Sequence, residues 1–130
     1  MKINSILLDS DFIFALQTQN DANHTKALKL EKVISKLNYE ICYLNFVKHE
    51  IATLISRRIG QSEAIMTVNS LANFKEIFVN EDLEKEVWQT FKSYSKKNIS
   101  FVDCANLTIA TKFDFKIASF DQFYPSEFLL

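Results

Sequence analysis

Four acidic residues at widely separated positions are the candidates for chemistry in this sequence: Asp9, Glu50, Asp103 and Asp121. Carboxylate oxygens are hard ligands that suit Mg²⁺ or Mn²⁺, ions that keep several waters and bind phosphate oxygens. An ion held in this way polarises a phosphate, lowers the pKa of an attacking water and stabilises the leaving oxygen. If the four residues meet in the fold, they predict metal-assisted hydrolysis of a phosphodiester bond.

Taken singly, each acid also has a purely structural explanation. Asp9 is a preferred residue type for a helix N-cap, and Asp121 fits a turn. Glu50 lies at the margin of the apolar stripe of its helix, where it can reach water or pair with Arg57. Asp103 follows a serine at the spacing of a capping box. Its helix is apolar nearly all round, so we expect Asp103 to be well buried, and a buried anion usually needs a cation.

The elements that must position these acids alternate between short apolar runs and amphipathic stretches. The apolar runs predict strands at 6–8, 40–44, 77–79 and 116–119, and a fifth strand at 127–130 is left open. Helical spacing predicts helices at 11–17, 24–37, 46–59, 62–73, 82–97 and 101–112. Alternating strands and helices favour an α/β protein, with a central parallel sheet of four or five strands in a three-layer α/β/α arrangement. Ligands bind such sheets beyond the carboxyl ends of the strands, where we expect all four acids.

Several predicted helix ends carry their own signals. The expected N-caps are Asn45, Asn80 and Ser100. The helix over 82–97 has acidic residues at its start, and we expect Lys96 and Lys97 in its last turn, where they complement the helix dipole.

Length, composition and charge exclude several classes of protein. A chain of 130 residues predicts a single domain over 1–130, and 48% hydrophobic residues exclude intrinsic disorder. Gly60 is the one glycine of the sequence, so neither a Walker loop nor a dinucleotide-binding fingerprint can be written. The net charge of −1 is no bulk signal for nucleic-acid binding, which would need a local patch. The candidate patches are Arg57 with Arg58 and the lysines at 26, 29, 32 and 36.

Cysteine usage and hydropathy indicate a cytoplasmic protein. Cys42 and Cys104 are too few for a disulfide scaffold, and both lie in apolar runs, so we expect them to be buried and free. No stretch approaches the ~18 apolar residues of a membrane span. We therefore expect no membrane contact.

Four segments, taken in order, resemble the signature segments of PIN-domain nucleases. They are 6–11, the helix that carries Glu50, 101–103 and 118–123. Their order and spacing are similar to those of the VapC-type toxins of toxin–antitoxin pairs, and the resemblance covers nearly the whole chain. It implies that Asp9, Glu50, Asp103 and Asp121 bind Mg²⁺ or Mn²⁺ and carry catalysis, supported by Ser119 and Asp11. Asp11 departs from the Asn, Ser or Thr that is more common at its position.

The same resemblance implies the partners of the protein. VapC-type proteins cleave structured RNA such as tRNA, form homodimers and are inhibited by a small cognate antitoxin that blocks the acidic pocket. Arg57 and Arg58 are weak candidates for contacts with the RNA.

Other interpretations stay open at this level. A PIN-like scaffold could bind RNA or protein without cutting. The segment 8–11 also matches the opening of aspartate-based phosphatases of the haloacid-dehalogenase type, although no basic residue follows cleanly at a later strand end. A response-regulator receiver would need an aspartate at the end of the third strand, where this chain has Asn80.

Overall fold

Four parallel strands form one sheet at the centre of the computed structural model, which describes residues 4–130. The strands are β1 (Ser5–Leu8), β2 (Glu40–Leu44), β3 (Lys75–Ile77) and β4 (Lys116–Ala118). Their order across the sheet is β3-β2-β1-β4, and each neighbouring pair is parallel. β1 and β4 are therefore neighbours although they lie far apart in the chain.

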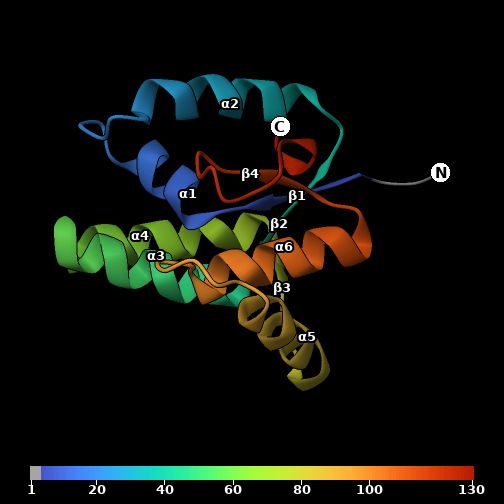
Figure 1. Cartoon of the computed structure of the whole chain (residues 1–130). Helices are drawn as coiled ribbons and strands as arrows, with labels where there is room; N and C mark the ends of the chain where they lie inside the picture. Colours follow the sequence, from blue (N-terminus) through green and yellow to red (C-terminus); the bar gives the residue numbers. More distant parts are fainter. Residues whose placement is uncertain (1–3) are drawn as a thin grey trace.

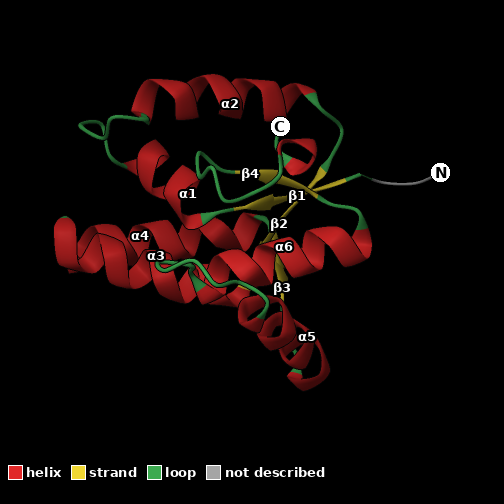
Figure 2. Ribbon diagram, in the orientation of Figure 1, coloured by secondary structure: helices red, strands yellow, loops and turns green. Residues whose placement is uncertain are grey.

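Helices cover both faces of this sheet. They are α1 (Ser10–Gln17), α2 (His24–Lys36), α3 (Asn45–Arg58), α4 (Gln61–Ser70), α5 (Glu81–Lys92) and α6 (Phe101–Phe113). Figures 1 and 2 show the sheet between α2 on one side and α6 on the other, which confirms the predicted three-layer α/β/α fold. No helix in the described part of the chain has the length and apolar character needed to cross a membrane.

The core lies around the central strand β1, which is buried along its whole length. Ile6 and Leu7 are fully buried, and so are Leu44 and Ile117 on the neighbouring strands. A parallel sheet that is covered on both faces buries both sets of side chains, which is why these strands are continuous apolar runs. Cys42 and Cys104 are buried and free, as predicted.

The helix predicted over 82–97 is shorter than expected, because α5 ends at Lys92. Ser93 ends it: the Ser93 N–H bonds to the carbonyls of Gln89 and Thr90, and its Oγ donates to the Thr90 carbonyl at 2.6 Å. Lys96 and Lys97 therefore lie in the loop that leads to α6, and the prediction that they complete the last helical turn is wrong. Lys92 is the basic residue in that turn.

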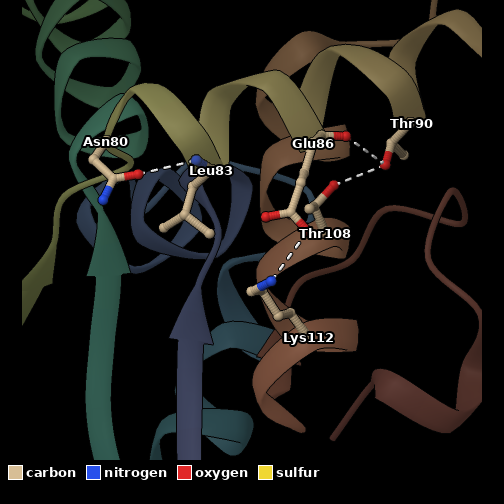
Figure 3. A network of polar contacts seen from close by, with 6 residues as sticks. All are labelled: Asn80, Leu83, Glu86, Thr90, Thr108 and Lys112. Carbon is tan, nitrogen blue, oxygen red and sulfur yellow. Dashed lines mark hydrogen bonds and ion pairs between the residues drawn. The ribbon is translucent and has the colours of Figure 1, made fainter.

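Polar contacts fix α5 against α6, as Figure 3 shows. The hydroxyls of Thr90 and Thr108 lie 2.9 Å apart, and Lys112 pairs with Glu86 at 3.1 Å. At the other end of α5, Asn80 caps the helix as predicted and accepts from the Leu83 N–H at 2.9 Å. These contacts fix the second half of α5 against α6, and the Asn80 cap fixes where α5 begins.

Other expectations about element ends need correction. Asn45 is the first residue of α3 and not its cap; its Oδ1 accepts from the Val79 N–H at 3.0 Å. This bond takes Val79 out of the sheet, so β3 lies at 75–77 and not at 77–79. The predicted helix over 62–73 is α4 followed by a 3-10 turn, Leu71–Asn73. The tail forms a 3-10 turn and one bridge, Ile117 to Leu129, in place of a fifth strand.

Candidate active site

The pairing of β1 with β4 forms the centre of the acidic edge, the carboxyl edge of the sheet at which Asp9, Asp11, Glu50, Asp103 and Asp121 lie. Leu8 pairs with Ala118, and the Asp9 N–H donates to the Ala118 carbonyl at 3.0 Å. The residues that follow the two strands, Asp9 and Ser119, are therefore held side by side, and the Ser119 Oγ donates to Asp9 Oδ2 at 2.9 Å. The strand-end rule predicts that Asp9 and Asp121, which follow these two strands, lie at the same edge of the sheet.

Asp9 is 2% exposed and accepts hydrogen bonds from four directions. It is the N-cap of α1, where Oδ1 accepts from the Ser10 N–H at 2.8 Å. Oδ1 also accepts from Asn106 Nδ2 at 3.2 Å, while Oδ2 accepts from Ser119 and, at 3.0 Å, from the Tyr124 hydroxyl. The capping role suggested by sequence is present, but it uses one bond of four, so capping alone does not explain this environment.

Asp11 lies on the opposite side of the Ser119 hydroxyl. Both of its carboxylate oxygens lie 3.1 Å from Ser119 Oγ, and Oδ2 accepts from the Phe120 N–H at 3.0 Å. Ser119 Oγ also accepts from the Asp121 N–H at 3.0 Å. One hydroxyl thus connects three acidic residues.

Asp103 approaches Asp9 from the first turn of α6. Ser100 caps this helix as predicted and accepts from the Asp103 N–H at 3.3 Å. The Tyr124 hydroxyl lies 3.1 Å from Asp103 Oδ1 and 3.0 Å from Asp9 Oδ2. Asp103 also contacts the carboxyl group of Asp121. Asp103 is half-buried and not well buried as predicted from its apolar helix, because its first turn lies at the edge of the sheet.

Glu50 reaches the same edge from α3. Its Oε1 accepts a hydrogen bond from the Ser10 hydroxyl, next in the chain to Asp9. The alternative pairing with Arg57 is not formed. Arg57 lines a cavity of about 590 Å³ together with Glu50, whereas the Arg58 guanidinium lies over the Phe14 ring at 5.5 Å. The structure thus places Arg57, but not the guanidinium of Arg58, beside the acidic edge.

The five acids of this edge lack basic partners. Within residues 4–130, no lysine, arginine or histidine forms an ion pair with Asp9, Asp11, Glu50, Asp103 or Asp121. Burial and the Asp11 carboxylate raise the pKa of Asp9 to about 7. Burial, Asp9 and Asp121 raise the pKa of Asp103 to about 8, and burial raises the pKa of Asp11. Ionisation of these carboxyl groups is therefore costly in the folded chain, as it is at sites where a bound cation offsets the negative charge.

Sequence reasoning missed two polar residues of the site. Asn106 is fully buried and its Nδ2 donates to Asp9 and to the Tyr124 hydroxyl, each at 3.2 Å. Tyr124 is 3% exposed and contacts both Asp9 and Asp103. The available signals were positional: Asn106 lies one turn after Asp103 on the same face of an apolar helix, and Tyr124 follows Asp121 closely.

All donors at this edge are oxygens, the ligand type that Mg²⁺ and Mn²⁺ prefer. The buried Oδ1 of Asn106 has no hydrogen-bond partner among the described residues. In that same part of the chain, no group of three or more Asp, Glu, His or Cys side chains has the arrangement of a formed metal site. The donor set fits a hard divalent ion in its chemistry, while its hydroxyl groups now bridge the carboxylates.

A four-stranded parallel sheet between two layers of helices, with acidic residues at its carboxyl edge, is a PIN-like arrangement. VapC20 of Mycobacterium tuberculosis, a sarcin-ricin loop cleaving toxin, is similar in structure, with a TM-score of 0.78 and 26% identity over 89% of each chain. VapBC2 of Rickettsia felis, solved with a DNA fragment from its promoter, has a TM-score of 0.65 and 12% identity over 90% of this chain and 88% of that one. These similarities confirm the predicted resemblance to VapC-type PIN-domain toxins. No family model and no curated protein sequence matches the chain.

Proposed function

We propose that this protein is an Mg²⁺- or Mn²⁺-dependent endoribonuclease and the toxin of a toxin–antitoxin pair. The observation that carries the proposal is the gathering of Asp9, Glu50, Asp103 and Asp121 at one sheet edge, with no basic partner among residues 4–130. A folded protein has little reason to concentrate unpaired carboxylates unless a cation binds them. The structural similarity to a toxin that cleaves an RNA loop supports RNA as the substrate.

The four carboxylates would hold the metal. When bound, the ion supplies polarisation of the phosphate, a more acidic water and stabilisation of the leaving oxygen. The side chains of the site prepare the carboxylates for this role. Ser119, Tyr124 and Asn106 hold the two oxygens of Asp9 in fixed directions, so little reorganisation is needed on binding.

Asp103 has a raised pKa because acidic groups crowd around it. Burial, Asp9 and Asp121 raise the pKa of its carboxyl group to about 8 in the metal-free protein. A bound divalent ion would lower this pKa again, because a nearby positive charge favours the ionised carboxylate. We therefore assign Asp103, like the other three acids, to holding the ion.

The proposed biological context includes a protein inhibitor and a second copy of the chain. The similarity to VapBC2 supports a small cognate antitoxin as partner. Homodimer formation, tRNA as one possible RNA target and a cytoplasmic location belong to the same proposal. Arg57, beside Glu50, is the arginine that we expect to contact the RNA.

The rival functions make different demands on the same edge. An aspartate phosphatase needs a lysine near the acid that becomes phosphorylated, and none pairs with Asp9 within residues 4–130. A silent scaffold has no need for the carboxylates, so their neutral variants would bind the partner unchanged. Both alternatives can therefore be separated from the nuclease by substitution.

RNA cleavage by the purified protein tests the proposal. We expect the protein to cut ribosomal RNA or tRNA in Mg²⁺ or Mn²⁺ and to lose this activity in EDTA. Asp9→Asn and Asp103→Asn should each lower the rate by about a hundredfold or more while the protein stays folded. Asp82→Asn, at an exposed position on α5, is the matched control and should cut normally. Normal cleavage by Asp9→Asn would refute the metal site. Sequencing of the 5′ ends of the fragments identifies the target.

A further inference from the structure

The loop between α5 and α6 borders the acidic edge and forms a second cavity beside it. This cavity of about 530 Å³ is lined by Tyr94, Lys96 and Lys97 of the loop and by Asp103 and Asp121 of the site. The loop was predicted to be helix, and its lysines were assigned to a helix end. Because α5 stops at Lys92, their side chains border the carboxylates.

Aromatic rings connect this cavity to the acids. Tyr94 packs on Phe123 with ring centroids 5.2 Å apart, and Phe123 packs edge-on against Tyr124 at 5.3 Å. The Tyr124 hydroxyl in turn contacts Asp9 and Asp103. Tyr94 is 38% exposed and forms the open end of this row of rings. A planar group stacked on Tyr94 would therefore extend this row of rings and lie next to the acidic edge.

The two lysines are available to a ligand. Both are exposed, and within residues 4–130 neither pairs with an acidic side chain, although Asp103 and Asp121 line the same cavity. An acidic edge repels the phosphates of an RNA strand, so a substrate needs cations beside it. Free ammonium groups at this border supply that charge.

We propose that this loop is a binding subsite for an unpaired nucleotide of the RNA, next to the phosphate that is cut. The base stacks on Tyr94, and the backbone phosphates of that nucleotide and its neighbour contact Lys96 and Lys97. A base within a duplex is stacked on its neighbours and cannot reach the ring, so the subsite selects single-stranded or looped RNA. This inference rests on the proposed nuclease function and names the form of its substrate.

The helices around the loop make the subsite a fixed one. Thr90 with Thr108 and Lys112 with Glu86 hold α5 against α6 (Figure 3). At the two ends of the loop, Phe91 near the end of α5 packs on Phe101 at the start of α6, with ring centroids 6.3 Å apart. Asn98 has the left-handed φ of 66°, which turns the chain back toward α6. A preformed surface loses less conformational entropy when the nucleotide binds.

RNA binding measured in an uncut complex tests the subsite. The parent is Asp103→Asn, which should not cleave, and the probe is a fluorescein-labelled single-stranded RNA of mixed sequence, about ten nucleotides long. Fluorescence anisotropy gives its affinity over a range of salt concentrations, with a duplex of the same sequence as the competing substrate. We expect the single strand to bind more tightly than the duplex.

Three further variants separate the contribution of lysine charge from that of base stacking. Replacing Lys96 and Lys97 by alanine should weaken binding and reduce the slope of log K against log salt by about 1.4, because each phosphate contact on a single strand contributes about 0.7. Tyr94→Leu should weaken binding about tenfold, whereas Tyr94→Phe, which keeps the ring, should bind like the parent. The charge-matched control replaces Lys75 and Lys116, the first residues of β3 and β4, which lie at the opposite edge of the parallel sheet, and should leave the slope nearly unchanged.

The outcomes distinguish this inference from the proposed function. If the wild type cuts RNA but the lysine pair and Tyr94→Leu bind like the parent, the subsite is refuted and the nuclease stands. Tighter binding of the duplex would also refute the subsite. So would substitutions that leave RNA binding intact but weaken the binding of an antitoxin peptide, and this result would assign the loop to the antitoxin. If the wild type does not cut RNA in Mg²⁺ or Mn²⁺, the proposed function itself falls.

Discussion

Replacing Asp9 by asparagine should stabilise the metal-free protein, and the gain should grow as the pH rises. The pKa of Asp9 is raised from 3.8 to about 7 by burial and by Asp11. The folded protein therefore holds this proton more tightly than the unfolded chain does. The resulting stability is fully present below pH 4 and is lost as the pH rises through 7. Between pH 5 and pH 8 the linkage relation gives a loss of roughly 2–3 kcal/mol for this one group.

Asparagine at this position can keep the hydrogen bonds without the charge. Its Oδ1 accepts from the Ser10 N–H and from Asn106, and its amide nitrogen can donate to the hydroxyl oxygen of Ser119. Urea unfolding in EDTA, followed by the fluorescence of Trp88, the single tryptophan of the sequence, gives the free energy of unfolding at each pH. The gain of Asp9→Asn over the wild type should be larger at pH 8 than at pH 5 by roughly 2–3 kcal/mol.

Two comparisons make this result specific to the acidic edge. Asp82→Asn removes an exposed carboxylate on α5 and should show the same difference from the wild type at both pH values. Mg²⁺ added at pH 8 should stabilise the wild type but not Asp9→Asn, because the ion binds the ionised group. If the advantage of Asp9→Asn did not grow with pH, the assignment of a strained, proton-binding carboxyl group to Asp9 would be wrong.

Further substitutions examine the network around this group. Tyr124→Phe removes the hydroxyl between Asp9 and Asp103, so it should lower the rate of RNA cleavage and cost about 1 kcal/mol of stability in urea unfolding. Ser119→Ala removes the donor shared by Asp9 and Asp11; a fall in cleavage rate with little change in RNA affinity is the expected result, and a change in affinity alone would contradict it. Asn45→Ala leaves the Val79 N–H without its partner and should cost roughly 1–3 kcal/mol in thermal or urea unfolding, with cleavage by the folded protein unchanged.

Much of the fold follows from local pattern in the sequence. The apolar runs that became β1, β2 and β4 are found within a residue or so, and the caps Asn80 and Ser100 act as predicted. The errors fall where long-range contacts override local preference. Asn45 is a good capping residue, yet its side chain bonds to Val79, and this contact also shortens the third strand. A local sequence pattern cannot reveal a hydrogen bond between Asn45 and Val79, which are 34 positions apart.

The acidic residues could be placed from the sequence because residues that follow parallel strands lie at the same edge of the sheet. Asp9 and Ser119 meet wherever β1 and β4 are neighbours and parallel. The residues that orient them could not be found in this way. Asn106 looks like a polar interruption of an apolar helix, and Tyr124 like an aromatic residue in a loop. Their roles depend on the angle at which α6 and the tail pack on the sheet, which periodicity does not encode.

The pairing of the first strand with the last strand also determines when the acidic edge can form. During synthesis, Asp9 leaves the ribosome early, but Ser119, Asp121 and Tyr124 emerge more than a hundred residues later. Until β4 docks beside β1, the carboxylates have no fixed neighbours. A chain truncated before residue 116 therefore lacks Ser119, Asp121 and Tyr124, and with them the contacts that orient Asp9.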